Sequence, residues 1–264
     1  MNIKKKIENY WNKQPCNIKY SKNKFGTKQF FNDISKKKFF VEKHIKNFAE
    51  FSKFKNKNVL EIGCGIGTTA FEFVKNKANY VGLDISKKSL EIAELRFKVF
   101  NIKGDYKFIY GDSEKISKIK LLSKKKFDLI YSFGVLHHSP NLKKSFNEIY
   151  KIAKKNTLIK IMLYNKFSYK SFMLNLTKYR YEAQNNCPVV LLVNEDDIKK
   201  IVKNKFKIIS ITKDFIFPYK IKPYKKNRYE LIEHFESMPK NIFNSLKKNI
   251  GEHLLITLKK INYK

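Results

Sequence analysis

Three glycines and two carboxylates near residue 60 have the types and the spacing of a nucleotide-binding turn. The glycines alternate within the stretch NVLEIGCGIGTT at residues 58–69, at Gly63, Gly65 and Gly67. Glycine has no Cβ, so it adopts positive φ easily and lets a ligand approach the main chain. The carboxylates are Glu61, before the glycines, and Asp84, which ends the next apolar run and could accept both hydroxyls of a ribose. These residues predict that a nucleotide-like ligand lies against the turn.

A strand and a helix must hold these glycines in place. Residues 59–62 are mostly apolar and β-branched, which is typical of a parallel strand that is buried on both faces. Thr68 and Thr69 begin a helical stretch, so free N–H groups and the positive end of a helix dipole face the ligand. Burying Glu61 in this strand costs free energy unless it has a partner, for example a cationic ligand.

Four motifs, in order along the chain, resemble those of the class I S-adenosylmethionine-dependent methyltransferases. Residues 61–67, EIGCGIG, match the family's first motif, E-x-G-x-G-x-G, rather than the G-x-G-x-x-G of dinucleotide dehydrogenases. The other three are YVGLD at 80–84, GDS at 111–113 and FDLIYSFGVLHH at 127–138. The longer pattern is similar to a bacterial, methyltransferase type 11-like branch whose substrates are not defined by the resemblance.

The resemblance implies that S-adenosyl-L-methionine is the cofactor. It places Asp84 at the ribose, Asp112 and Ser113 at the adenine amino group, and the loop after the fourth strand at the methionine end. The cofactor-binding residues that it implies are Glu61, Gly63, Cys64, Gly65, Gly67, Asp84, Ile85, Asp112, Ser113, Ser132 and Phe133.

The expected fold class is α/β. It is a doubly wound, Rossmann-like sheet of seven strands, mostly parallel with an antiparallel last strand, with helices on both faces. The strands are expected near residues 59–62, 80–84, 106–110, 127–133, 157–164, 206–212 and 253–258. Ser86, Asn141 and Asn194 are predicted to begin the helices that follow them, because their side chains can cap free N–H groups.

The 264 residues suffice for one domain with insertions. We expect residues 1–54 to form an N-terminal helical lid or cap, with one amphipathic helix over 33–54. Residues 55–164 are the expected cofactor-binding core and 165–193 a substrate-side insertion. The core is expected to end within 194–264, with a second insertion at 213–246. In the family that the motifs resemble, such insertions build the substrate pocket.

The net charge of +34 does not by itself indicate a nucleic-acid partner. Only three of the 57 basic residues are arginine, and the lysines are spread along the whole chain. A nucleic-acid footprint would cluster on one face and would use arginines for bidentate phosphate contacts. The codon bias of an A/T-rich genome would give the same excess of lysine. A nucleic-acid partner is therefore left open but not favoured.

Three features favour a cytoplasmic protein. Cys16, Cys64 and Cys187 are far apart and have no C-x-x-C spacing, as expected of reduced thiols. Residues 1–9 carry the positive charge of a signal peptide, but no apolar stretch follows them. The sequence also has no apolar window long enough for a transmembrane segment.

His137 and His138 are the candidate catalytic residues. Methyl transfer from a sulfonium depends on in-line alignment and on the exclusion of water, and an oxygen acceptor must also lose a proton. These two histidines, in the loop after the fourth strand, are the best placed bases. Alternatively, one or both orient the loop without moving a proton. His44, His234 and His253 are interpreted as isolated structural or surface residues. No His/Cys set has the spacing of a metal site.

The leading hypothesis is a methyltransferase that acts on an oxygen of a small molecule, such as a metabolite, a lipid-like quinone precursor or a sugar. The aromatic residues of both insertions suit an enclosed acceptor pocket. The first alternative, an RNA methyltransferase, is suggested by the charge. The second is a catalytically silent binding protein on the same fold, and the complete set of cofactor motifs argues against it. The sequence leaves the oligomeric state undefined.

Overall fold

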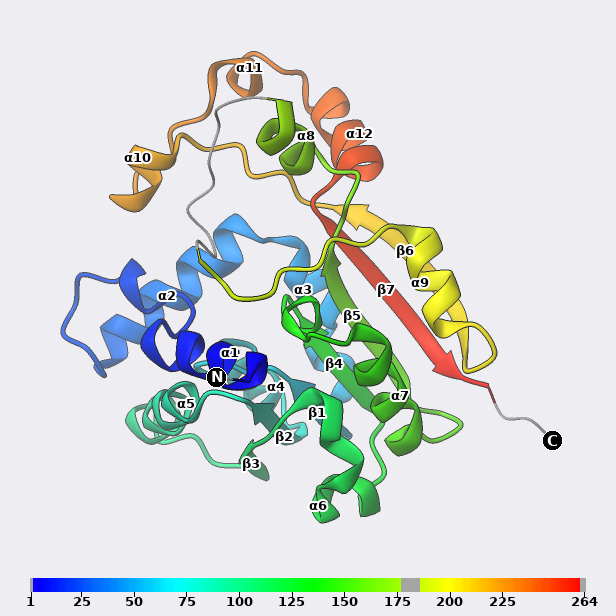
Figure 1. The fold of residues 1–264 in the computed structure, drawn as a ribbon. Coiled ribbons are helices and arrows are strands. Elements are labelled where there is room, and N and C mark those ends of the chain that lie inside the picture. The colour runs from blue at the N-terminus through cyan, green and yellow to red at the C-terminus, as the bar shows by residue number, and fades with distance from the viewer. Residues whose placement is uncertain (1, 177–185, 262–264) are drawn as a thin grey trace.

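Seven strands form one mixed sheet in the computed structural model, which describes residues 2–176 and 186–261 (Figure 1). Their order is β3-β2-β1-β4-β5-β7-β6, and β7 runs antiparallel to both of its neighbours. The remaining pairs are parallel, so the predicted fold class is confirmed. The strands are β1 (Asn58–Ile62), β2 (Asn79–Asp84), β3 (Tyr106–Tyr110), β4 (Leu129–Phe133), β5 (Leu158–Tyr164), β6 (Phe206–Asp214) and β7 (His253–Lys260).

Helices cover both faces of this sheet. On one face the core includes apolar side chains from α6, α7 and α9, and on the other it includes side chains from α3, α4 and α5. The helices are α1 (Ile3–Lys13), α2 (Lys28–Val41), α3 (His44–Ala49), α4 (Thr68–Lys75), α5 (Lys87–Val99), α6 (Lys120–Lys124), α7 (Leu142–Ile152), α8 (Tyr169–Leu176), α9 (Glu195–Val202), α10 (Ile221–Lys225), α11 (Glu233–Glu236) and α12 (Lys240–Ile250). Short 3-10 turns are η1 (Ile18–Tyr20), η2 (Phe51–Phe54), η3 (Ser113–Lys118) and η4 (Leu136–His138).

The central strands are apolar at every second position on each face. Val59 packs in the core under α3 to α5, whereas its neighbour Leu60 packs in the core under α6, α7 and α9. Successive side chains of a strand point to opposite faces, so a strand that is buried on both faces reads as a continuous apolar run. This is why the short run before the glycines predicted a parallel strand.

Three predicted helix caps are confirmed. The Ser86 hydroxyl accepts from the Ser89 N–H at 3.0 Å, and the Asn141 side chain accepts from the Lys144 N–H at 2.9 Å. Asn194 forms a capping box with Asp197 at the start of α9. Each cap satisfies N–H groups that have no partner within the helix.

The single helix expected over residues 33–54 is wrong. The Thr27 side chain accepts from the Phe30 N–H at 3.2 Å, so α2 begins earlier than expected, and it ends at Val41. Lys160 from β5 donates to the Phe48 carbonyl at 2.8 Å, a carbonyl that a continuing helix would need. Glu50, which pairs with the same lysine, has left-handed backbone geometry with φ 51°. The chain therefore turns between α3 and η2 before it enters β1.

The segments outside the regular core gather at one edge of the sheet. In Figure 1, α8, α10, α11 and α12 lie beyond the carboxyl end of β5, and α1 packs against α5. This is the edge at which open α/β sheets bind their ligands. Residues 177–185 of the expected first insertion lie outside the described residues, and the division into domains stays a prediction. None of the described helices has both the length and the apolar character needed to cross a membrane.

Candidate functional site

A cavity of about 570 Å³ lies where the parallel strands end. Its walls come from α1 and the turn that follows it, from α2, and from the glycine loop after β1. The carboxyl ends of β2, β3, β4 and β5, the helices α8 and α10, the segment after β6 and the first residue of β7 also line it. The cavity thus joins the predicted cofactor motifs to residues of the second expected insertion, which begins at residue 213.

The glycines of the loop have different physical roles. All three have positive φ: 79° at Gly63, 52° at Gly65 and 72° at Gly67. A Cβ on Gly63 would lie 2.2 Å from a methyl group of Val135, and one on Gly67 would lie 3.1 Å from the Cβ of Ala93. A Cβ on Gly65 would meet no atom within 4 Å, although Gly65 lines the cavity. Gly63 and Gly67 therefore permit packing, whereas Gly65 keeps space open above the main chain.

Asp84 holds the loop in this position. One carboxylate oxygen accepts from the Gly65 N–H at 2.8 Å, and the other accepts from the Ser86 N–H at 2.8 Å. Burial raises the pKa of Asp84, and these N–H donors oppose that shift. Each carboxylate oxygen has a second lone pair. Asp84 lines the cavity together with Ile85, so it retains capacity to accept from a ligand hydroxyl.

Glu61 also borders the cavity, but the protein itself satisfies it. Its carboxylate accepts from the Thr69 hydroxyl and from the Tyr80 hydroxyl, the latter at 2.5 Å. Burial raises the pKa of Glu61 to about 7. The sequence suggested a cationic ligand as partner for this acid, whereas the structure provides two hydroxyl donors from α4 and β2.

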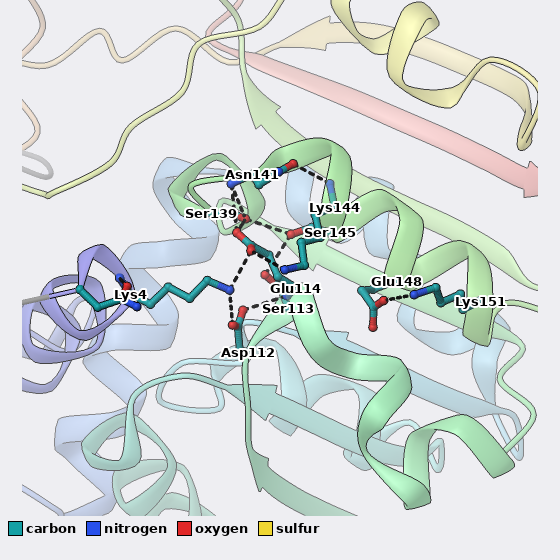
Figure 2. A network of polar contacts seen from close by, with 11 residues as sticks. Lys4, Asp112, Ser113, Glu114, Ser139, Asn141, Lys144, Ser145, Glu148 and Lys151 are labelled. Atoms are coloured by element: carbon teal, nitrogen blue, oxygen red, sulfur yellow. Dashed lines mark hydrogen bonds and ion pairs between the residues drawn. The ribbon is translucent and has the colours of Figure 1, made fainter.

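Asp112 is bound by the N-terminal helix, as Figure 2 shows. Lys4 Nζ lies 2.5 Å from one Asp112 oxygen and 2.7 Å from Glu114, and the other Asp112 oxygen accepts from the Glu114 N–H at 2.8 Å. Sequence reasoning missed Lys4, because nothing distinguishes it from Lys5 and Lys6. These ion pairs connect α1 to the end of β3.

The same network reaches the loop after β4 (Figure 2). Glu114 accepts from the Ser139 hydroxyl at 2.7 Å and from the Asn141 N–H at 3.0 Å. Ser113, which lines the cavity, lies within hydrogen-bond distance of Ser145, at 3.1 Å. The predicted adenine-side residues and the loop after β4 are therefore fixed relative to one another.

Nine of the eleven predicted cofactor residues line this cavity, and two do not. Ser132 is buried, and its hydroxyl donates to the Ile62 carbonyl at 3.0 Å, so it fixes β4 against β1. Gly67 packs against α5. The nine are Glu61, Gly63, Cys64, Gly65, Asp84, Ile85, Asp112, Ser113 and Phe133. What each would contact in a bound cofactor stays a prediction.

The two predicted bases differ in access to the cavity. His138 lines it, and its Nδ1 lies 2.7 Å from the Val189 carbonyl. Its Nε2 is buried and has no hydrogen-bond partner among the described residues, and burial lowers the pKa of His138 to about 4. His137 is fully buried, stacks on Tyr164 with ring centroids 4.0 Å apart, and is not part of the cavity wall.

His44 and His253 form a pair, so the interpretation of them as isolated residues is wrong. His44 Nε2 lies 2.9 Å from His253 Nδ1, and His253 lines the cavity. The antiparallel pairing of β7 places His253 opposite Tyr164, at the carboxyl end of β5. Aligning the predicted last strand antiparallel to the fifth strand would have placed His253 near the carboxyl end of β5. His234 is exposed, as expected, and lies 2.8 Å from the Tyr169 hydroxyl.

Among the charged side chains of the cavity wall that the sequence did not single out are two acids and two lysines near the histidine pair. Glu252 accepts from the Phe217 N–H at 2.9 Å, and burial raises the pKa of both Glu252 and Glu42. The two cations are Lys38 from α2 and Lys170 from α8. Aromatic rings of Tyr164, Phe215, Phe217 and Tyr224 complete this end of the cavity.

The cavity fits a nucleoside-bearing cofactor at its other end. Open space above Gly65 leaves the main chain accessible, and the Asp84 carboxylate beside it can accept further hydrogen bonds. The N-terminal end of α4 follows directly at Thr68, which lines the cavity. Its Oγ1 is buried without a hydrogen-bond partner among the described residues.

A sequence profile of the family described as "Methyltransferase domain" matches residues 53–236. The chain is 32% identical to a ubiquinone biosynthesis O-methyltransferase of Pelagibacter ubique, over 60% of this chain and 63% of that protein. It is 30% identical to a sterol 24-C-methyltransferase of Saccharomyces cerevisiae, over 36% of this chain and 24% of that protein. An uncharacterised protein of Methanocaldococcus jannaschii is 26% identical over 92% of this chain and 94% of its own length. The chain thus spans less than two thirds of the first two of these relatives.

Solved methyltransferases share the fold. A magnesium protoporphyrin IX methyltransferase from Synechocystis with bound S-adenosylmethionine superposes with a TM-score of 0.60 at 14% identity, over 99% of this chain and 98% of that one. An S-adenosylmethionine-dependent methyltransferase from Anabaena variabilis gives a TM-score of 0.63 at 16% identity, over 99% and 96% of the two chains. At these identities the likeness shows the fold alone.

Proposed function

Because this chain belongs to the class I S-adenosylmethionine-dependent methyltransferases, we propose that it transfers a methyl group from S-adenosylmethionine to an oxygen atom of a small molecule. One observation carries this proposal. A single cavity has the glycine loop and its carboxylates at one end, and aromatic rings with His253, which pairs with His44, at the other. Both reactants can therefore lie in one enclosed space, which is what an in-line transfer requires.

The cofactor supplies a methyl group that is already activated on a sulfonium. In the proposed arrangement the backbone at Gly63 and Gly65 borders the cofactor, and Asp84 accepts hydrogen bonds from the ribose hydroxyls. Asp112 and Ser113 lie at the adenine end. Phe133, at the end of β4, borders the methionine end. These roles are supported by the position of all six residues in the wall of one cavity.

The protein must also align the acceptor and exclude water. Rings from α1, β5 and the segment after β6, among them Trp11, Tyr164 and Phe215, enclose the acceptor end. A hydroxyl acceptor needs a base, and His138 remains a candidate because it lines the cavity. The names of two relatives support oxygen as the acceptor atom: the Pelagibacter protein and a malonyl-[acyl-carrier protein] O-methyltransferase of Ilyobacter polytropus, 28% identical over 70% of this chain.

The cavity volume favours a small molecule over RNA as the acceptor. A volume of about 570 Å³ that is bordered by α1 and α10 suits a compact ligand. A putative ribosomal RNA methyltransferase of Methanocaldococcus jannaschii is 33% identical, but over only 38% of this chain and 24% of that protein. RNA is therefore an outcome that the experiment must distinguish.

The test begins with calorimetric titration of S-adenosylmethionine into the wild type and the Asp84→Asn variant. Losing the negative charge at a hydroxyl-binding carboxylate should weaken binding about 10- to 100-fold, since a hydrogen bond to a charged group contributes about 1.5–3 kcal/mol. Asp105→Asn is the matched control, because Asp105 is an exposed aspartate outside the cavity. Absence of binding by the wild type would contradict the proposed cofactor.

The acceptor is then sought with methyl-labelled S-adenosylmethionine in a cell extract that is separated into RNA and small-molecule fractions. We expect label in the small-molecule fraction, in products whose methyl group is lost under ether- or ester-cleaving conditions. Label that appears only in RNA would contradict the small-molecule proposal and support the alternative.

A further inference from the structure

We propose that His253 is the catalytic base that takes the proton of the acceptor hydroxyl, and that His44 is the positioning residue that holds its imidazole. The inference rests on the proposed function, since it names the group that acts on the oxygen acceptor. It also narrows the acceptor to a molecule with a phenolic or enolic hydroxyl.

The hydrogen bonding of His253 leaves one ring nitrogen for a ligand. Nδ1 is engaged by His44 Nε2 at 2.9 Å. Nε2 has no hydrogen-bond partner within residues 2–176 and 186–261, and His253 is part of the cavity wall. When a second group holds one ring nitrogen of a histidine, that hydrogen bond fixes both the tautomer and the orientation of the ring. The other nitrogen can then act as the base.

Neighbouring rings fix the plane of this imidazole. Phe215 stacks on His253 with centroids 4.6 Å apart at 25°, and Tyr164 stacks with centroids 5.8 Å apart at 20°. His253 and Tyr164 are also paired residues of β7 and β5. A base on paired strands with stacked rings is held more rigidly than one on a loop, and rigid placement favours proton transfer.

The surroundings of the pair favour a neutral imidazole. Burial lowers the pKa of His253 well below its ordinary value, and His44, Lys170, His137 and Lys38 lower it further. Burial also lowers the pKa of His44 to about 4, with Asp214 opposing the shift and Lys247 and Lys38 adding to it. The imidazole is therefore unprotonated at neutral pH, which is the form that a base requires.

This environment also defines the acceptor. An imidazole of low pKa is a weak base, so it suits a hydroxyl that is itself acidic, such as a phenol or an enol, rather than an aliphatic alcohol. Lys38 and Lys170 line the same cavity and can stabilise the negative charge that develops on the oxygen. The rings of Phe133, Phe217 and Tyr224 in the wall suit a flat acceptor.

The step balances without any further reactant. The acceptor hydroxyl gives its proton to His253 Nε2 while its oxygen bonds to the methyl carbon. The electron pair of the broken carbon–sulfur bond remains on sulfur, so the products are a methyl ether, a neutral thioether and an imidazolium. The imidazolium then loses its proton to solvent.

His138 is the competing candidate, and its geometry is less favourable. Its Nδ1 is held by the Val189 carbonyl, and its Nε2 is buried from solvent. A hydroxyl in the cavity would reach this nitrogen only after the wall moved. Both ring nitrogens of His137 are also buried, so a hydroxyl in the cavity would not reach them either.

The first test compares three variants with the acceptor found by the label screen. His253→Asn keeps an amide where Nδ1 bonds His44 and removes Nε2. We expect kcat to fall at least about 100-fold with KM within about threefold, because general bases contribute typically 10²–10⁴-fold. His234→Asn, an exposed histidine outside the cavity, should retain wild-type rates. Loss of activity in His138→Asn with full activity in His253→Asn would overturn the inference.

The positioning role of His44 has its own test. His44→Gln places an amide near the position of Nε2 and should retain most of the activity. His44→Ala should lower kcat about tenfold and move the acidic limb of the pH profile, because the imidazole loses its partner. Equal rates and equal pH profiles in all three proteins would contradict a positioning role, whatever their melting temperatures.

A third measurement needs no turnover. NMR spectra of ring-labelled histidines in the protein saturated with S-adenosylhomocysteine are recorded with increasing catechol, and the His253 signal is identified by its loss in His253→Asn. We expect the His253 resonance to shift and that of His234 to stay unchanged. No shift at saturating catechol overturns the inference. Absence of methyl transfer to any hydroxyl acceptor, with the shift present, contradicts the proposed function instead.

Discussion

The two ends of the cavity are built in different ways. The end that we propose for the cofactor uses backbone and short side chains at the ends of consecutive strands, at residues 61–67, 84–85 and 111–113. The end that we propose for the acceptor uses long side chains from α2, α8, β7 and the segment after β6, a set that spans more than half of the chain. Ligand space at the first end exists because glycines lack a Cβ. The chemical character of the second end comes from aromatic and charged side chains.

This difference determines how each end responds to substitution. At the glycine loop a single added methyl group changes backbone conformation or fills the ligand space. At the acceptor end a substitution removes a chemical group but leaves the backbone of β7 in its sheet. Changes at the first end should therefore affect folding or cofactor binding, and changes at the second should affect turnover.

The largest effect is expected from alanine at two glycines of the same loop. Gly63→Ala combines a clash with Val135 and a left-handed backbone, so it should destabilise the fold by about 3–5 kcal/mol. Gly65→Ala has only the left-handed backbone, φ 52°, which costs about 1–2 kcal/mol. Its methyl group, however, enters the open space and should weaken S-adenosylmethionine binding at least tenfold.

Urea unfolding and calorimetric titration measure these two variants. The pair is its own control, because both residues are glycines with positive φ in one loop. Equal stability losses, or unchanged cofactor affinity in Gly65→Ala, would remove the distinction between packing and ligand space at the cofactor end.

A smaller effect is expected at Glu61, a buried acid beside the glycine loop. Its pKa is raised by burial from 4.5 to about 7, so the folded protein binds more protons than the unfolded chain between these values. Stability that Glu61 contributes at pH 4.5 should therefore be lost as the pH rises to 7, by up to about 3 kcal/mol. The measurement is unfolding free energy against pH.

Glu61→Gln provides the comparison, because it keeps the shape of the side chain without a titratable group. The difference between the two unfolding curves isolates Glu61 from the other buried acids. A difference that is constant with pH would show that folding leaves the pKa of Glu61 unchanged, and would contradict this prediction.

The smallest effect is expected for Lys4, whose side chain comes from α1, far in sequence from the acids that it contacts. Its ion pairs with Asp112 and Glu114 are partly exposed, at 26% for Lys4, so they contribute about 1 kcal/mol or less. Lys4→Met should speed cofactor release about two- to fivefold. Trp11, the single tryptophan, lines the cavity and reports release by stopped-flow fluorescence.

Lys5→Met is the control, since Lys5 pairs with Glu8 on the same helix rather than with β3 or its loop. High salt should reduce the difference between Lys4→Met and the wild type, because it screens exposed ion pairs. If Lys4→Met leaves the release rate unchanged, the ion pairs of α1 do not contribute to holding the cofactor.

Much of the fold and the cofactor end was predictable because their signals are local. A buried strand, an alternating glycine turn and a capping serine or asparagine depend on residues within a few positions of one another. The turn between α3 and η2 was not predictable in this way, since it involves Lys160, more than 100 residues away. The histidine pair needed the register of β7 against β5.

Local sequence was enough to indicate the class of ligand, because the glycine loop and the acids at the ends of β2 and β3 come from short segments that also line the cavity. Which histidines line the cavity depends instead on the packing of distant segments. His137 and His138 follow the fourth strand, where the sequence predicts a base. Their ring nitrogens are nevertheless buried, and that burial depends on the whole packed core. His44 and His253 are 209 residues apart, and strand pairing and helix packing alone bring their ring nitrogens to 2.9 Å.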